Sequence, residues 1–260
     1  MTLLDHAQRT ATGIKEQSKL QGKPAPEPAT LFESAWRDYI FAEVWTRPGL
    51  DLRSRYFISI SGAACEGGRA DVIDGYIRGA LTTGEISLVE LREAALHIAV
   101  YGGWSSGAAL DAAITRVQNE LGLAPAEIVP LRAEAWDPEQ RLQQGAKEFT
   151  HVMTFQGPPP VAPYFEGGIL NFVFGEMWHR PGLDQRARRW VTMVGVSNSS
   201  STIPIRTHTY GAMKSGNATM EEMQEFVLQY AIHGGWPKAS VMQSVVFEMG
   251  KLVAEGLPYS

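Results

Sequence analysis

Two arginine-containing strings, one in each half of the chain, are the first candidates for chemistry. Arg180 and Arg186 belong to the string Trp-His-Arg-Pro-Gly-Leu-Asp-Gln-Arg that begins at Trp178, and Arg47 and Arg53 hold the same places in the earlier string. A planar guanidinium binds a carboxylate through two parallel hydrogen bonds. Arg53 and Arg186 also fall in the first turn of a predicted helix, where a cation opposes the helix dipole by about 0.3–1 kcal/mol. These arginines therefore need an anionic partner, which is either a substrate carboxylate or one of the neighbouring acids Asp51, Asp184, Glu43 and Glu176.

His208 is the candidate general acid, because imidazole titrates near neutral pH. It falls in the second turn of a helix that is predicted to have Thr202 as its cap and Pro204 in its first turn. The corresponding residue of the first half is Tyr76. The alternative is a histidine without a catalytic role, either in the core or at the surface.

His233, directly before a Gly-Gly-Trp string, is a second catalytic candidate. His97 lies one helical turn before Tyr101 and could line the same pocket. A lone histidine on an apolar helix is more often a core residue. The tryptophans of the two halves are expected mainly in the core, because aromatic side chains bury a large area, with Trp236 as a possible pocket wall that contacts substrate.

These residues belong to a unit that occurs twice. Residues 41–55 match residues 174–188 at ten of fifteen positions with a constant offset of 133. Weaker similarity extends on both sides, from Gln8-Arg9 and Gln140-Arg141 to the two Gly-Gly-Trp strings. Because such a repeat indicates the architecture, we predict two domains, residues 1–130 and 131–260.

The elements that position the candidates are predicted to be helices, so the fold class is all-α. Apolar residues recur at helical spacing after Ser87, and sustained strand-like alternation is absent from the sequence. Predicted caps are Asp51 and Asp184, predicted capping boxes are Ser87–Glu90 and Thr219–Glu222, and predicted left-handed ends are Gly84 and Gly216. An amphipathic arm (residues 2–20 and 138–154) and a proline-rich link precede each unit. A lone arm helix is marginal in water, so we expect each arm to pack on the other repeat or on a neighbouring subunit.

Composition narrows the function classes. The formal net charge of −5 argues against a nucleic-acid-binding surface. The single cysteine, Cys65, excludes a disulfide framework within the chain and a multi-cysteine metal site. An acidic N-terminal segment and the absence of an 18-residue apolar run predict a cytoplasmic protein that neither enters nor crosses a membrane.

The string Trp-x-Arg-Pro-Gly-Leu-Asp-x-Arg-x-Arg, the helix pattern His208-x-x-Gly211-Ala212, and Gly-Gly-Trp-Pro at 234–237 resemble the carboxymuconolactone decarboxylase family. This family belongs to the alkylhydroperoxidase-D-like superfamily, and the similarity covers about residues 36–120 and 169–250. The resemblance implies a helical unit that assembles into rings, so a fused pair would form a homotrimer with six quasi-equivalent units. It also implies that Glu43 and Glu176 face the site as base or proton shuttle, with a structural ion pair as an equal alternative.

The redox branch of the superfamily requires a Cys-x-x-Cys pair before the helix histidine. These positions hold Ser201 and Pro204 in the second half, and Arg69 and Val72 in the first. A disulfide relay needs a thiolate and a resolving partner, so dithiol peroxidase activity is not expected.

Together these features predict a cofactor-independent lyase that decarboxylates a small carboxylated lactone or a related carboxylic acid. Arginine would hold the carboxylate, and His208 with Glu176 would transfer the proton. The site would be built mainly from the second half and completed by the first half or by a neighbouring subunit. The sequence shows neither a metal-binding cluster nor a phosphate or dinucleotide motif. An isomerase or lactone-opening enzyme with the same pocket, and a non-catalytic member with vestigial pockets, are the alternatives.

Overall fold

The computed structural model describes residues 5–67, 69–133, 135 and 137–259, and the regular elements among them are all helices. The first half contains α1 (His6–Gln21), α2 (Leu31–Ala35), the π-helix η1 (Trp36–Val44), α3 (Leu52–Cys65), α4 (Ala70–Thr82), α5 (Leu88–Gly102) and α6 (Trp104–Glu120). The second half contains α7 (Pro138–Met153), the π-helix η2 (Tyr164–Met177), α8 (Gln185–Ser199), α9 (Thr202–Lys214), α10 (Met220–Gly234) and α11 (Trp236–Ala254). The predicted all-α class is confirmed, and apart from α2 the order of helices is the same in both halves. Within the described ranges, the helices are too short or too polar to cross a membrane.

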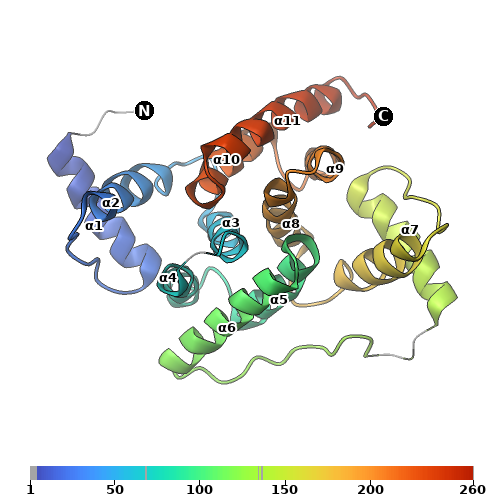
Figure 1. Cartoon of the computed structure of the whole chain (residues 1–260), viewed down its shortest axis with the longest axis horizontal. Helices are drawn as coiled ribbons and strands as arrows, with labels where there is room; N and C mark the ends of the chain where they lie inside the picture. The colour runs from blue at the N-terminus through green and yellow to red at the C-terminus, as the bar shows by residue number, and fades with distance from the viewer. Residues whose placement is uncertain (1–4, 68, 134, 136, 260) are drawn as a thin grey trace.

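The two halves interlock through their central helices. Figure 1 shows α3 and α8 side by side in the middle of the molecule, and α5 of the first half packs on α8 of the second. In the reciprocal contact, α10 of the second half packs on α3 of the first. One hydrophobic cluster therefore contains buried residues of both halves, among them Phe57, Ile98, Val191 and Phe226. The halves share a core.

A glycine permits the close approach of α5 to α8. A Cβ atom at Gly195 would lie 2.5 Å from the Cβ of Tyr101 and 2.8 Å from its carbonyl carbon. Gly62 has the equivalent place on α3, where an added Cβ would lie 3.2 Å from the Cβ of His233. Each half thus accepts a helix of the other half against a glycine on its central helix.

Each arm packs on its own half. Helix α1 lies against η1 and α4, and α7 lies against η2 and α9, at opposite ends of the molecule (Figure 1). An added Cβ at Gly79 would come within 1.8 Å of the Leu20 carbonyl oxygen, and one at Gly145 within 1.7 Å of the Leu170 carbonyl oxygen. The expectation that the arms pack on the other repeat is therefore wrong, because glycines in each half allow its own arm to approach its backbone. The alternative, a contact with a neighbouring subunit, stays a prediction.

The predicted helix ends agree with the structure, with one shift. Asp184 caps α8 by accepting a hydrogen bond from the Ala187 N–H at 2.9 Å, and Asp51 caps α3 in the same way. Ser201, not Thr202, is the N-cap of α9, so Thr202 is the first helical residue. The remaining predictions are confirmed for the capping boxes Ser87–Glu90 and Thr219–Glu222 and for the positive φ angles of Gly84 and Gly216.

The tryptophans divide into two groups. Trp45 and Trp178 are each 5% exposed and belong to the core, as predicted. Trp104 and Trp236 begin α6 and α11 and are 65% and 52% exposed. The core prediction is therefore wrong for this second pair, because both indoles stand at the start of a surface helix.

Candidate active site

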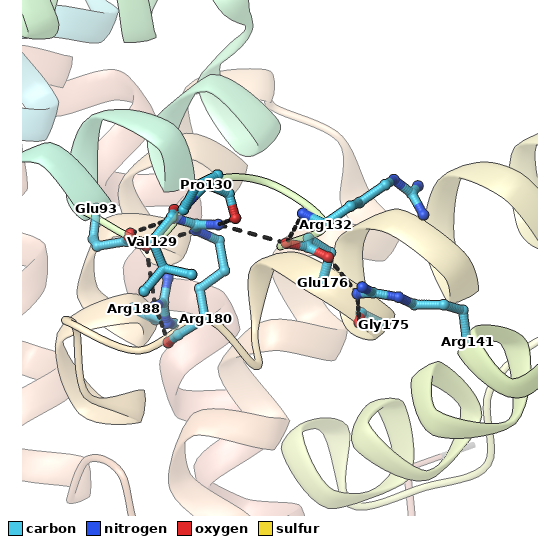
Figure 2. A network of polar contacts seen from close by, with 9 residues as sticks. All are labelled: Glu93, Val129, Pro130, Arg132, Arg141, Gly175, Glu176, Arg180 and Arg188. Atoms are coloured by element: carbon cyan, nitrogen blue, oxygen red, sulfur yellow. Dashed lines mark hydrogen bonds and ion pairs between the residues drawn. The ribbon is translucent and has the colours of Figure 1, made fainter. Parts of the chain in front are cut away.

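The arginines of the repeated string pair with acidic side chains of the opposite half. The Arg180 guanidinium donates to both carboxylate oxygens of Glu93 on α5, at 3.0 and 2.7 Å, and Arg188 lies 3.5 Å from the same carboxylate. Arg180 and Glu93 are buried, and Figure 2 shows them with Arg188 in one network. Arg47 makes the equivalent pair with Glu225 on α10, at 2.5 Å.

Arg53 and Arg186 form a second reciprocal pair of contacts. Arg53 donates to Asp184 at 2.6 Å and Arg186 donates to Asp51 at 2.9 Å, so each reaches the helix cap of the other half. Each also pairs with an acid in its own half, Glu90 and Glu222 respectively. The sequence left two readings open for the four motif arginines. The geometry favours the structural ion pairs, because carboxylates of the protein already bind the N–H groups of these four arginines. Most of these carboxylates belong to the opposite half of the chain.

Glu176 also has a structural role. Its carboxylate pairs with Arg141 of α7, accepts a hydrogen bond from the Arg132 backbone N–H at 3.1 Å, and lies 3.5 Å from Arg180 (Figure 2). Glu43 pairs with Arg9 of α1 in the first half. The expected role of Glu176 as base or shuttle is not supported by this placement, because its oxygens hold the arm and the connecting segment against the motif.

Arg189, one residue beyond the repeated string, lies in a different environment. Its side chain is 0% exposed, and it donates to the Val152 carbonyl oxygen at 2.7 Å and to the Asn217 side-chain oxygen at 3.3 Å. Its Nη1 lies 3.4 Å from Nδ1 of His208, and its guanidinium stacks over Trp178 at 5.1 Å. Within the residues that the structure describes, no carboxylate pairs with it. These three contacts account for three of the five N–H groups of the guanidinium.

Burial lowers the pKa of Arg189 to about 10, and the group therefore stays cationic at neutral pH. A buried cation without a carboxylate partner is unusual, since desolvation of an unpaired charge is unfavourable by several kcal/mol. Such groups occur where a ligand supplies the opposite charge. Arg189 is thus the carboxylate-binding candidate that the sequence analysis missed. The sequence does contain a signal for Arg189. The position directly after the repeated string differs between the halves, with Arg189 in the second and Tyr56 in the first.

His208 points its Nδ1 toward this cation. Arginine can only donate, so Nδ1 accepts and the proton of the neutral ring is on Nε2. Burial, and secondarily the charge of Arg189, lower the pKa of His208 well below its usual value. The free protein therefore holds His208 neutral at physiological pH, whereas the sequence analysis chose His208 because an imidazole ordinarily titrates near neutral pH.

Helix α5 of the first half completes the cluster around His208. The Tyr101 ring meets the His208 ring edge-on at 5.2 Å, and the Tyr101 hydroxyl accepts a hydrogen bond from the Trp178 indole at 2.8 Å. One turn earlier, Nε2 of His97 lies 2.9 Å from the Thr192 hydroxyl, and the pKa of His97 is lowered by burial and by nearby arginines. We call this cluster the Arg189 site; its members are Arg189, His208, Tyr101, His97, Trp178 and Thr192.

The equivalent place in the first half has a different composition. His233 of α10 packs on Tyr76 at 5.6 Å and on Trp36 at 5.9 Å, and Gln229 bonds to Ser59 at 2.8 Å. Tyr56 stands where the other site has Arg189. The structure therefore does not bring His233 to His208. It is the counterpart of Tyr101, and its predicted place beside His208 is wrong because α10 crosses to the first half.

Trp236 also lies outside the Arg189 site, since it is half-exposed at the start of α11 and makes no ring or polar contact with the cluster among the described residues. No group of three metal-binding side chains occurs in the described ranges. Cys65 is a free thiol whose pKa is raised by burial. A raised pKa disfavours the thiolate that redox chemistry requires.

Comparison with known proteins gives the same family as the motif. Residues 31–115 match the family model described as the Carboxymuconolactone decarboxylase family. The chain is 26% identical over 120 residues to 4-carboxymuconolactone decarboxylase of Acinetobacter baylyi, which spans 44% of this chain and 89% of that protein. It is 33% identical over 69 residues to nitrosuccinic acid decarboxylase npaB of Metarhizium robertsii, which spans 26% of this chain and 48% of that protein.

A helical segment of the first half thus matches the model of the carboxymuconolactone decarboxylase family, and both curated relatives are named as decarboxylases. The second half carries the same string of residues and the same order of helices. That the second half belongs to the same family, and that two domains meet at residues 130 and 131, stay predictions from this internal similarity.

Proposed function

We propose that the protein is a decarboxylase of a small carboxylated lactone or related carboxylic acid, and that the Arg189 site is where it acts. One observation carries the proposal: Arg189 is a fully buried guanidinium with no carboxylate partner among the described residues. The relatedness to two decarboxylases supports the reaction class. The reaction needs no cofactor in this proposal, because a conjugated carbonyl in the substrate accepts the electron pair.

Arg189 would bind the substrate through a bidentate contact with a carboxylate. The anion would replace the missing counter-charge and offset the desolvation of the guanidinium. Trp178, whose ring lies 5.1 Å from the guanidinium carbon, would hold this planar group in one orientation. Binding energy would therefore be used for orientation before the chemical step.

The bond between the carboxyl carbon and the substrate's ring carbon breaks, carbon dioxide leaves, and the electron pair moves into the conjugated carbonyl to give an enolate. Tyr101 accepts its hydrogen bond from Trp178, so its own O–H proton is available to the enolate oxygen. The enolate then takes a proton at carbon. Once the negative charge of a bound substrate offsets the charge of Arg189, His208 would take up a proton from solvent and deliver its Nε2 proton to this carbon, which leaves the ring neutral again.

Release of carbon dioxide from a panel of carboxylactones, β-keto acids and vinylogous acids tests the proposal. At least one member should be turned over, and His208→Ala should lower kcat by about 10²- to 10⁴-fold with a smaller change in substrate binding. A fully active His208→Ala protein would reject the role of His208. Cys65→Ser serves as the matched control and should retain activity, since the mechanism does not use the thiol.

A different proton transfer in the same site is the second candidate. The neutral His208 beside a tyrosine hydroxyl favours it, because these groups could also move a proton between two carbons of a lactone or assist ring opening. Product analysis separates the two reactions. An isomer or a ring-opened acid formed without release of carbon dioxide would show that the site carries out this proton transfer and not decarboxylation. No turnover together with tight carboxylate binding would indicate a non-catalytic member.

A homo-oligomer, with a trimer as the specific form, is part of the same proposal. Trp104 and Trp236 occupy equivalent positions at the starts of α6 and α11 and expose 65% and 52% of their surface. Exposed aromatic side chains are frequent in subunit interfaces. Light scattering should give the mass of three chains; a monomer would contradict this part of the proposal.

A further inference from the structure

A cavity lies in the first half, away from the Arg189 site. It has a volume of about 330 Å³ and lies between α1, the proline-rich link, the α2–η1 helices and the start of α4. This volume is at the lower end of the range for small-molecule pockets. Its lining includes Phe32 and Trp36, the amides of Gln17 and Gln21, and His233, which reaches it from α10 of the second half.

The His233 imidazole supplies an unused hydrogen-bonding atom. Its Nε2 is buried and has no partner among the described residues, while its ring packs against Trp36 and Tyr76. A buried polar atom without a partner is unfavourable by about 1–3 kcal/mol. Burial also lowers the pKa of His233 to about 4, so the ring is neutral at physiological pH. The cavity is therefore lined by a neutral imidazole, beside aromatic rings, whose buried Nε2 has no partner among the described residues.

The charge of this cavity differs from that of the Arg189 site. Its four charged lining residues are two cations and two anions, and Arg69 pairs with Asp71 at 3.0 and 2.8 Å. The Glu33 carboxylate accepts a hydrogen bond from the Ala29 N–H. The position that would correspond to Arg189 is Tyr56. The lining is thus balanced in charge, and it favours an uncharged ligand.

We infer that this cavity is a binding site for a small, uncharged aromatic molecule that carries a hydroxyl group. The ligand ring packs on Trp36 and Phe32, and its hydroxyl bonds to Nε2 of His233. A hydroxyl can donate or accept, so it satisfies either tautomer of the imidazole. The protein then has two sites of different chemistry, one for a carboxylate in the second half and one for a neutral aromatic molecule in the first.

Titrations with phenol, toluene and benzoate test the inference, with the indole N–H resonance of Trp36 as the reporter. Phenol should shift this resonance and bind more tightly than toluene. In His233→Phe, phenol should bind about twofold to tenfold more weakly, the range expected for one hydrogen bond, and the preference over toluene should disappear. Phe32→Ala, in a side chain that is 69% exposed, should weaken both ligands without disturbing the fold.

Two controls keep this site distinct from the Arg189 site. Ile203→Ala, at an exposed residue of α9, should leave phenol binding unchanged. Arg189→Gln should weaken benzoate and leave phenol unaffected. The inference is overturned if millimolar phenol does not shift the Trp36 resonance, or if His233→Phe and Phe32→Ala bind phenol as the unmodified protein does.

Discussion

Arg189 is distinguished from the other arginines near it by its lack of a carboxylate. Arg180, Arg186 and Arg188 each meet at least one acidic side chain, whereas Arg189 bonds to a carbonyl, an amide and an imidazole. A guanidinium is always charged at neutral pH. Among the described residues, the fold therefore leaves the Arg189 cation without a carboxylate, and this is the physical basis of the proposal that Arg189 binds the substrate.

Buried neutral histidines make the stability of the protein depend on pH. His97 and His208 have pKa values well below their usual value, because burial disfavours the charged ring. The unfolded chain binds more protons than the folded one once pH falls below about 6.5, so the free energy of unfolding is highest above that pH and declines toward pH 5. Denaturant titrations at pH 7.5 and pH 5 should show this decline.

His97→Gln should make the decline shallower, since it removes one of these rings and copies Gln229, which occupies the equivalent place in the first half. The control His151→Gln, at an exposed residue, should keep the full dependence. An unchanged slope in His97→Gln would show that His97 is not held neutral in the folded state.

At the scale of the helices, local sequence was sufficient to predict most of what is observed. Caps such as Asp184 and left-handed glycines such as Gly84 act within one turn, so their signals are readable without knowledge of the fold. The π-helical form of η1 and η2, and the exposure of Trp104 and Trp236, depend on contacts between elements. The packing of α5 and α10 on the opposite halves also depends on contacts between elements, and it determines which side chains lie together.

Glu93 on α5 provides a test of this crossing. It is 1% exposed and pairs with Arg180 and Arg188 of the second half. Glu93→Gln would leave the buried Arg188 without a carboxylate and Arg180 with only the longer contact to Glu176 at 3.5 Å, so the free energy of unfolding should fall by about 3–5 kcal/mol. Chemical denaturation measures this change.

Glu248→Gln is the matched control, because it breaks an ion pair with Arg206 in which the carboxylate is half-exposed. A change of about 1 kcal/mol or less is expected there. Equal effects of the two substitutions would contradict the role of Glu93 as the buried link between the halves.

For the whole molecule, the repeat could be recognised from the sequence, but the way in which the two copies share residues could not. The offset of 133 residues pairs Arg180 with Arg47 and Arg186 with Arg53. It does not show that Glu93 of the first half pairs with Arg180 of the second, or that Glu225 of the second half pairs with Arg47 of the first. Such pairing across a shared core depends on three-dimensional packing. The sequence therefore grouped His233 with His208 as catalytic candidates, whereas in the structure Tyr101 is the residue that packs on His208.

The shared core predicts that neither half folds well alone. Residues 1–130 without the second half would expose the faces of α3 and α5 that pack on α10 and α8. Such a fragment should lack the cooperative thermal unfolding of the intact chain and should regain it when mixed with residues 131–260. A fragment that unfolds cooperatively by itself, with near-ultraviolet circular dichroism like that of the intact protein, would contradict the interlocked arrangement.

The most direct test of the central claim compares carbon dioxide release by Arg189→Gln and Arg186→Gln on the best substrate of the panel. Removal of a group that stabilises charge in the reaction lowers turnover by about 10²- to 10³-fold. Arg189→Gln should therefore lose at least about 100-fold in kcat/KM while it keeps the circular dichroism spectrum of the unmodified protein, and Arg186→Gln should stay within about threefold. If Arg186→Gln lost activity while Arg189→Gln stayed active, the account would be contradicted. The substrate carboxylate would then bind to an arginine of the repeated string.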